Sequence, residues 1–488
     1  MLRQLARDSA VYGSAAFVSR AVSFLLLPVY TRVFSPSDYG TIELLLVLAA
    51  LINVTVALEI AQGVARYFVD AGSEDRRRYA STALFFAAGA YTCFALVALA
   101  FAPSIAGTLL GDTAQAGAVR IAVFSTWAAG LFYQAQLQLR WQLRPTRYAF
   151  ASLLAAAATI GSTIVFVIVL GLGVDGVFLG YLAGNLVGAA AAFSFLRDTY
   201  RLRFDVEKLK QMLGFSVPLV ASSVAVFLNA YVDRIAISRL LGLTEVGIYS
   251  VAFRLASIVG LVLIGFQTAL MPLVYARYQE RETPAELARV FRLFILLAIS
   301  AFVCLSLFSR EIVATVASRE FEDAAALMPL LVPAVILSAM YVFAPGPFLA
   351  KRTVMIGAIN VTAAGFNVVL NVTLIPVLGL WGSAAATLAS ATVAFGLMMV
   401  ASQRMYWVPH AWQALARAVA VAVVIVGAAA ALGLLDADAW SPGPVAAKTA
   451  LALLGLGVAV ALLLQKQERQ IAIDWTRSFL RSLPTQSR

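Results

Sequence analysis

Residues 31–40, "TRVFSPSDYG", return in altered form at residues 238–247, "SRLLGLTEVG", and this repeat decides how the chain is organised. A shift of 207 positions superimposes the two segments and matches Arg32 with Arg239, Ser37 with Thr244, Asp38 with Glu245 and Gly40 with Gly247. Matched residues in matched order are the mark of an internal repeat. We therefore expect two copies of one structural unit in the chain.

The composition is that of a membrane protein. Hydrophobic residues make up 62% of the 488 residues and charged residues only 12%, against roughly 25% charged in soluble domains. A helix that crosses a bilayer needs about 20 apolar residues. Fourteen such stretches can be placed, at 9–34, 41–65, 80–103, 117–139, 149–171, 176–196, 214–238, 247–275, 291–308, 325–350, 353–376, 380–402, 412–435 and 445–465.

A second pair of segments places the boundary between the copies. "GVDGVFLGYLA" (173–183) matches "GLWGSAAATLA" (379–389) at a shift of 206, between the fifth and sixth span of each copy. Because six spans is an even number, both copies enter the membrane from the same side, as in many transporters with parallel repeats. The sequence thus predicts an all-α integral membrane protein with a six-helix lobe at 1–200, a second at 201–405, two added helices at 406–465 and an amphipathic cytoplasmic tail at 466–488.

The basic residues predict the orientation. If the N-terminus is cytoplasmic, 27 of the 36 lysines and arginines fall on the cytoplasmic side. Since cytoplasmic loops are enriched in these residues, both termini are expected inside. The net charge of +11 follows this distribution between loops, so it does not indicate a nucleic acid as partner.

Ionisable side chains within apolar spans indicate function or an internal partner, because a lone charge is costly there. Arg20 lies near the middle of the first span, on a face of small and polar residues. It could bind an anion, form an ion pair with Glu59 of the second span, or do both. Asp233 and Arg254 are expected at similar depth on neighbouring helices. They could pair with each other, while Arg234 could instead form an outward-facing anion site.

Asparagines form a stripe on the eleventh span. Asn360, Asn367 and Asn371 follow one another at helical spacing. Amides in this position either hold helices together by hydrogen bonds or contact a polar ligand, and both interpretations stay open. The sequence contains no GxxxxGK[ST] phosphate loop and no Cys/His ligand spacing, so neither a nucleotide cofactor nor a metal is predicted.

Three segments together resemble the polysaccharide transporters of the multidrug/oligosaccharidyl-lipid/polysaccharide exporter superfamily, and among them the O-antigen and capsule repeat-unit flippases. They are "SRAVSFLLLPVYTRVFSPSDYG" (19–40), "VDRIAISRLLGLTEVGIYSVAFRLA" (232–256) and "FNVVLNVTLIPVLGLWGSAAATLAS" (366–390). The resemblance covers residues 9 to about 400 and marks the fold more than the substrate.

The resemblance implies a flippase of the bacterial inner membrane that moves an undecaprenyl-diphosphate-linked oligosaccharide to the outer leaflet by alternating access. It implies that cavity arginines, Arg20 first, engage the diphosphate. Membrane lipids, and a polysaccharide polymerase with export machinery, are the expected partners. The alternatives are a multidrug exporter or a lipid II exporter of the same superfamily. A membrane polymerase or glycosyltransferase is expected less, because the outer loops are short.

Overall fold

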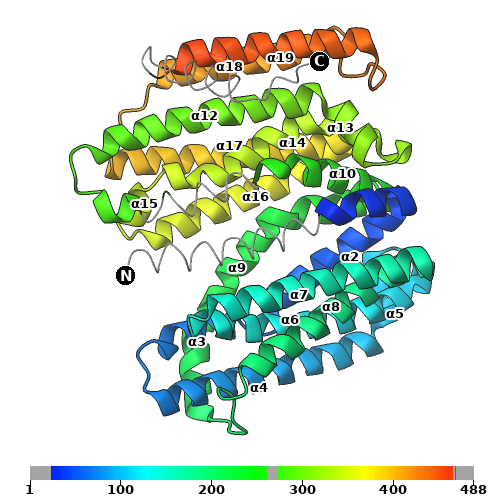
Figure 1. Cartoon of the computed structure of the whole chain (residues 1–488), viewed down its shortest axis with the longest axis vertical. Helices are drawn as coiled ribbons and strands as arrows, with labels where there is room; N and C mark the ends of the chain where they lie inside the picture. Colours follow the sequence, from blue (N-terminus) through cyan, green and yellow to red (C-terminus); the bar gives the residue numbers. More distant parts are fainter. Residues whose placement is uncertain (1–23, 261–269, 271–272, 465–467, 469–488) are drawn as a thin grey trace, which may run out of the picture. The chain divides into compact units, whose positions relative to one another are not determined.

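The computed structural model describes residues 24–260, 270, 273–464 and 468, and every regular element in that part of the chain is a helix (Figure 1). The helices are α2 (Pro36–Thr55), α3 (Ile60–Phe68), α4 (Ser73–Ala100), α5 (Ala102–Leu109), α6 (Ala116–Trp141), α7 (Pro145–Ile164), α8 (Gly173–Phe195), α9 (Val206–Leu240), α10 (Leu243–Ala256), α12 (Thr283–Leu307), α13 (Ser309–Val316), α14 (Ala324–Ala339), α15 (Gly346–Leu349), α16 (Thr353–Leu378), α17 (Leu380–Met405), α18 (Trp412–Ala431) and α19 (Pro442–Leu463). The prediction of an all-α membrane protein is confirmed.

Thirteen helices in the described part of the chain are long and apolar enough to cross a membrane. Of the first predicted span, residues 24–34 lie in that part and include the short helix Phe24–Val33, whereas Arg20 lies outside the described residues. The same holds for the predicted tail at 466–488, except for Glu468. The count of fourteen spans and the side of the membrane on which the termini lie therefore stay predictions.

The second predicted span is broken, so the prediction of one continuous helix over 41–65 is wrong. Helix α2 ends at Thr55 and α3 begins at Ile60. Between them Leu58 and Glu59 both adopt left-handed backbone conformations, with φ of 49° and 53°. Residues other than glycine seldom do so, because their Cβ crowds the backbone there. Hydrophobicity alone does not reveal such a break.

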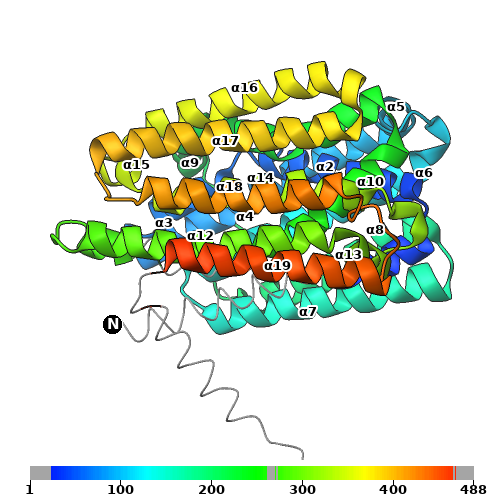
Figure 2. The same cartoon turned by 90° about the horizontal axis from the view of Figure 1, so that it is seen from above.

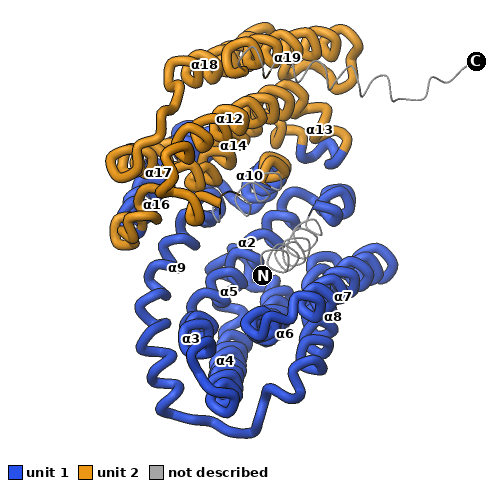
Figure 3. The backbone as a smooth tube through the Cα atoms, turned by 60° about the vertical axis from the view of Figure 1, so that its left-hand side comes forward, with its two compact units in different colours: residues 1–254, 316–321, 357–390 blue, residues 255–315, 322–356, 391–488 orange. Residues whose placement is uncertain are grey.

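The described residues fall into two compact units (Figure 3). Unit 1 consists of residues 1–254, 316–321 and 357–390, and unit 2 of residues 255–315, 322–356 and 391–488. Within unit 2, α18 and α19 pack against each other and against α12 (Figure 2). The Nζ of Lys448 on α19 lies 2.6 Å from Oε1 of Glu311 on α13, and both side chains are buried. The four-part division predicted from the repeat stays a prediction.

Within unit 1, the two repeated segments of the sequence touch each other. A Cβ placed on Gly40 would lie 2.0 Å from the carbonyl oxygen of Leu243, and one on Gly247 would lie 2.0 Å from the carbonyl oxygen of Pro36. Pro36 matches Leu243 under the same shift that matches the two glycines. The contact is therefore reciprocal, as at an interface between two copies related by a two-fold axis. Only glycine allows two helix backbones to approach so closely.

The second repeated pair also has a common conformation. Gly173 is the first residue of α8 and has a φ of 59°, and Gly379 directly precedes α17 and has a φ of 57°. Each glycine makes the left-handed turn by which one span ends and the next begins. The repeat read from the sequence thus corresponds to matched turns in the structure.

We predict that Gly247→Ala destabilises the protein strongly, because the new methyl group would overlap the Pro36 carbonyl. Overpacking of this kind costs about 1–3 kcal/mol. The measurement is the thermal unfolding midpoint in detergent. Gly161→Ala is the matched control, since nothing lies within 4 Å of its added methyl group and alanine favours a helix. Equal midpoints for the two variants would contradict the close approach.

His410 generates a prediction about pH. It lies between α17 and α18 in unit 2, with its ring 4.5 Å from Phe291 and 4.9 Å from Trp412, between centroids. Burial lowers the pKa of His410 to about 4. The unfolded chain binds this proton below about 6.5, so folding stability falls as the pH falls from about 6.5 towards 4. His410→Phe should therefore lose less thermal stability than the wild type between pH 7 and pH 5. An unchanged loss would show that His410 does not contribute.

Candidate functional site

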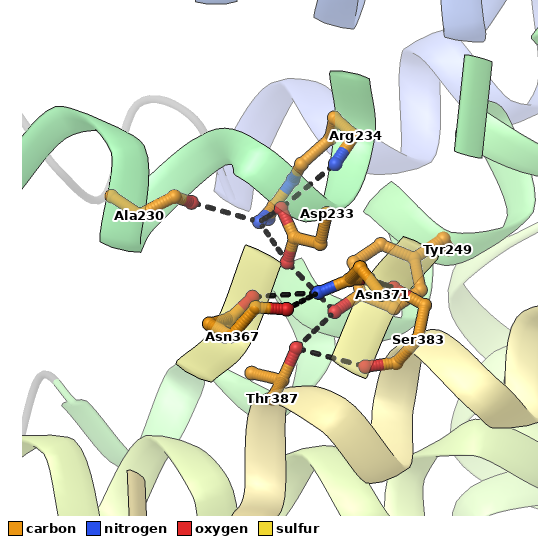
Figure 4. A network of polar contacts seen from close by, with 8 residues as sticks. All are labelled: Ala230, Asp233, Arg234, Tyr249, Asn367, Asn371, Ser383 and Thr387. Atoms are coloured by element: carbon orange, nitrogen blue, oxygen red, sulfur yellow. Dashed lines mark hydrogen bonds and ion pairs between the residues drawn. The ribbon is translucent and has the colours of Figure 1, made fainter. Parts of the chain in front are cut away.

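A buried polar network joins four helices of unit 1: α9, α10, α16 and α17 (Figure 4). Its members are Asp233, Arg234, Tyr249, Asn367, Asn371, Ser383 and Thr387. Each polar group is expensive in hydrocarbon unless it is hydrogen-bonded. The helices bring these residues together although their sequence separation reaches more than 150 positions.

The charged end of this buried polar network is an ion pair between neighbouring residues. Nη1 of Arg234 lies 2.8 Å from both carboxylate oxygens of Asp233 and donates to the carbonyl oxygen of Ala230 at 3.0 Å. The guanidinium carbon of Arg234 lies 4.0 Å from the centroid of the Phe253 ring. Asp233 is 4% exposed and Arg234 5%. Both side chains are buried from water, so each charge is stabilised by the other instead of by solvent. This pairing allows both charges to stay within a span.

Tyr249 connects this pair to the asparagine stripe. Its hydroxyl donates to Oδ2 of Asp233 at 2.8 Å and lies 3.0 Å from Oγ1 of Thr387. One turn away, the Ser383 hydroxyl donates to Oδ1 of Asn371 at 2.8 Å. The Asn371 amide in turn donates to Oδ1 of Asn367 at 2.6 Å. The two asparagines therefore hydrogen-bond within the protein, as expected of residues that hold helices together.

The predicted pair of Asp233 with Arg254 is wrong. Asp233 binds Arg234, and Nη2 of Arg254 on α10 binds Oε1 of Glu43 on α2. The guanidinium carbon of Arg254 also lies 5.6 Å from the centroid of the Tyr39 ring. Glu43 and Arg254 follow Gly40 and Gly247 by three and seven residues, so they extend from the point where the two helices cross. Estimated depth in the membrane did not reveal this partner.

Within the described part of the chain, Glu59 and Asn360 do not join the buried polar network. Glu59 is half-buried at the break between α2 and α3. Asn360 is half-buried on α16, two turns before Asn367, and no hydrogen bond links it to the network within the described residues. Arg20 lies outside those residues. The structure thus unites Asp233, Arg234 and two of the three asparagines.

Tyr249, Thr387, Ser383 and Glu43 were missed in the sequence. Glu43 had a usable signal, since it is an acid in the otherwise apolar run "TIELLLVLAALINV". The hydroxyl residues had none, because serine, threonine and tyrosine are common in membrane helices. In the described part of the chain, no group of three or more His, Cys, Asp or Glu side chains is placed to hold a metal ion.

The chain belongs to a family of polysaccharide biosynthesis proteins. Residues 29–326 match the family described as "Polysaccharide biosynthesis protein". A Haloferax volcanii protein named "Probable low-salt glycan biosynthesis flippase Agl15" is 24% identical over 402 residues, which are 80% of this chain and 81% of that protein. A protein of the Lsg locus of Haemophilus influenzae is 23% identical over 315 residues, 60% of this chain and 71% of that protein.

Two solved structures share the fold. The lipid II flippase MurJ in an inward closed conformation aligns with a TM-score of 0.73 at 14% identity, over 93% of this chain and 100% of that chain. An inward-facing multidrug resistance MATE family transporter of the MOP superfamily aligns with a TM-score of 0.61 at 17% identity, over 81% and 94%. At these identities the likeness shows the fold alone.

We predict that Asp233→Asn destabilises the protein by about 3–5 kcal/mol, because it leaves the Arg234 charge buried without a counter-ion. The double variant Asp233→Asn/Arg234→Gln should be more stable than this single variant, since it removes both charges. Thermal unfolding in detergent of the two single variants and the double variant completes a cycle. Additive effects of the two substitutions would show that the pair is not coupled.

Proposed function

We propose that this protein is a flippase for a polyprenyl-diphosphate-linked oligosaccharide in the bacterial inner membrane. Membership of the polysaccharide biosynthesis family supports a role in making a glycan. A relative named as a glycan biosynthesis flippase supports transport of a lipid-linked intermediate. The cargo we propose is the repeat unit of an O-antigen, capsule or exopolysaccharide, carried on undecaprenyl diphosphate.

The observation that carries the proposal is the buried polar network inside an apolar fold. A membrane protein with a purely structural role does not need an ion pair, a tyrosine and two asparagines within its spans, because burying each polar group in the membrane costs free energy. In transporters, polar and ionisable groups within spans mark the pathways of substrates and ions. Acidic and basic side chains are paired at both Asp233–Arg234 and Glu43–Arg254, so each pair can exchange partners.

The arginines have different parts in the proposal. Arg20 is proposed to bind the diphosphate, since its fork of donors fits phosphate oxygens in bidentate fashion. Arg234 and Arg254 are each bound to a carboxylate, so a phosphate can reach them only by displacing Asp233 or Glu43. Such displacement would couple the arrival of cargo to the contact between α2 and α10.

The other predicted residues fit around this core. Asn360 is the asparagine we assign to sugar hydroxyls, because Asn367 and Asn371 already use their amides within the protein. Glu59 is proposed to act in coupling, either with Arg20 or with a cation. It lies where the helix is discontinuous, and discontinuous helices form the ion and substrate sites of many transporters.

The test is complementation of a deletion strain, with surface polysaccharide as readout. Arg20→Ala should be nearly inactive, because the cargo's two negative charges would lose their counter-charge. Arg20→Lys should retain part of the activity, since it keeps the charge and loses the bidentate fork. The amount of each variant in the membrane is measured in parallel.

Full activity of Arg20→Ala at normal abundance would remove Arg20 from the site and move the diphosphate to Arg234. A deletion strain that stops growing while its surface polysaccharide is intact would contradict the proposed cargo. It would favour the lipid II alternative instead.

A further inference from the structure

A basic cleft opens at one end of the helices of unit 1, away from the buried polar network. Its volume is about 680 Å³. It is formed by the end of α3, the start of α4, the turn between α6 and α7 and the segment after α8, and its lining includes Arg76, Arg77, Arg144, Trp141, Asp198 and Thr199. Four chain segments that are distant in sequence therefore contribute to one concave surface.

Two arginines of this basic cleft, Arg76 and Arg144, are held by backbone carbonyl oxygens, and no ion pair neutralises them in the part of the chain that the structure describes. Arg76 donates from Nε to the carbonyl oxygen of Phe68 and from Nη2 to that of Val69, both at 2.9 Å. Arg144 donates from Nη1 to the carbonyl oxygen of Phe195, also at 2.9 Å. A carbonyl oxygen orients a guanidinium but carries no net charge, so both side chains keep their positive charge available to an anion.

Arg77 has no such restraint. Within the described residues it has no carboxylate at ion-pair distance, whereas Arg66 on the preceding helix α3 binds Asp70 at 2.9 Å. Arg77 also lines a second, smaller hollow of about 230 Å³ together with Glu74, Arg78, Arg201 and Arg203. The two hollows therefore share Arg77. Against three arginines in the basic cleft stands one acid, Asp198.

The rim of the basic cleft is apolar. Leu143 is 77% exposed and Val69 is 66% exposed, and both line the cleft. Leu143 also holds a left-handed backbone conformation, with φ of 54°, at the turn between α6 and α7. Glycine would be less strained there, by roughly 1–2 kcal/mol for the backbone. Exposed apolar side chains and a tryptophan beside arginines are typical of the membrane–water interface.

We infer that the basic cleft binds the phosphate head group of a membrane lipid. The arginines meet the phosphate, while Leu143, Val69 and Trp141 contact the first part of the lipid chains. Two lipids carry this chemistry: an anionic glycerophospholipid and a polyprenyl diphosphate. Only the second depends on the proposed function, since a glycerophospholipid would bind whatever the cargo is.

The experiment is native mass spectrometry of the full-length protein with phosphatidylglycerol, with phosphatidylcholine and with a polyprenyl diphosphate. Arg77→Gln should raise the dissociation constant of the anionic lipid that binds by about fivefold, the usual effect of one basic side chain near a lipid phosphate. Arg66→Gln is the matched control, because it also removes one exposed arginine but one that Asp70 already neutralises. Phosphatidylcholine should bind all three proteins equally.

The two anionic lipids separate the sources. If Arg77→Gln weakens the binding of phosphatidylglycerol alone, the basic cleft is assigned to a structural lipid. If it weakens the binding of the polyprenyl diphosphate alone, the basic cleft is assigned to the carrier of the cargo. Unchanged dissociation constants for both lipids in Arg77→Gln would overturn the inference. An equal loss of lipid affinity in Arg66→Gln would also overturn it, because the effect would then follow from the overall charge of the protein and not from the basic cleft. Arg77 is exposed, and the test of the proposed function rests on Arg20 and surface polysaccharide instead, so failure here leaves the proposed function untouched.

Discussion

The reciprocal contact of Gly40 with Gly247 is the constraint on which the charged part of unit 1 depends. Each glycine allows the backbone of one repeat to touch that of the other, since any side chain would overlap a carbonyl group. Helices α2 and α10 start on either side of this contact. As a result Glu43 and Arg254, which stand just beyond it, can neutralise each other within an apolar environment. Without the close approach, both charges would have to leave the span or find water.

Either partner of an ion pair inside a membrane can in principle be replaced by another ion of the same charge. The attraction between two charges is strong in a low dielectric, but an anion of equal charge can replace the carboxylate at nearly the same position. Under the function proposed above, Asp233–Arg234 and Glu43–Arg254 would each keep an arginine neutralised within the span until the diphosphate of the cargo takes the place of the carboxylate. The Tyr249 hydroxyl contacts both Asp233 and Thr387 of α17. A movement of Asp233 would therefore alter a contact with α17.

The hydrogen bonds of the asparagine stripe divide it into two parts. Asn367 and Asn371 are buried and hydrogen-bond to each other, and Asn371 also accepts a hydrogen bond from Ser383, which links α16 to α17. Asn360 is half-buried and stands apart. Residues of the same type on the same helix therefore differ in burial and in hydrogen bonding, and Ser383 of the neighbouring α17 accounts for part of that difference.

The sequence by itself determined the membrane class, most of the spans and the repeat. These follow from hydrophobicity summed over about 20 residues and from matched glycines, which are local properties of the chain. The partners of Asp233 and Arg254 were decided only by the tertiary structure. Depth in the membrane can be counted along a helix, but the face that a helix turns to its neighbour depends on packing. The break at Leu58 and Glu59 likewise could not be predicted from the sequence, because residues other than glycine seldom adopt the left-handed conformation that both have.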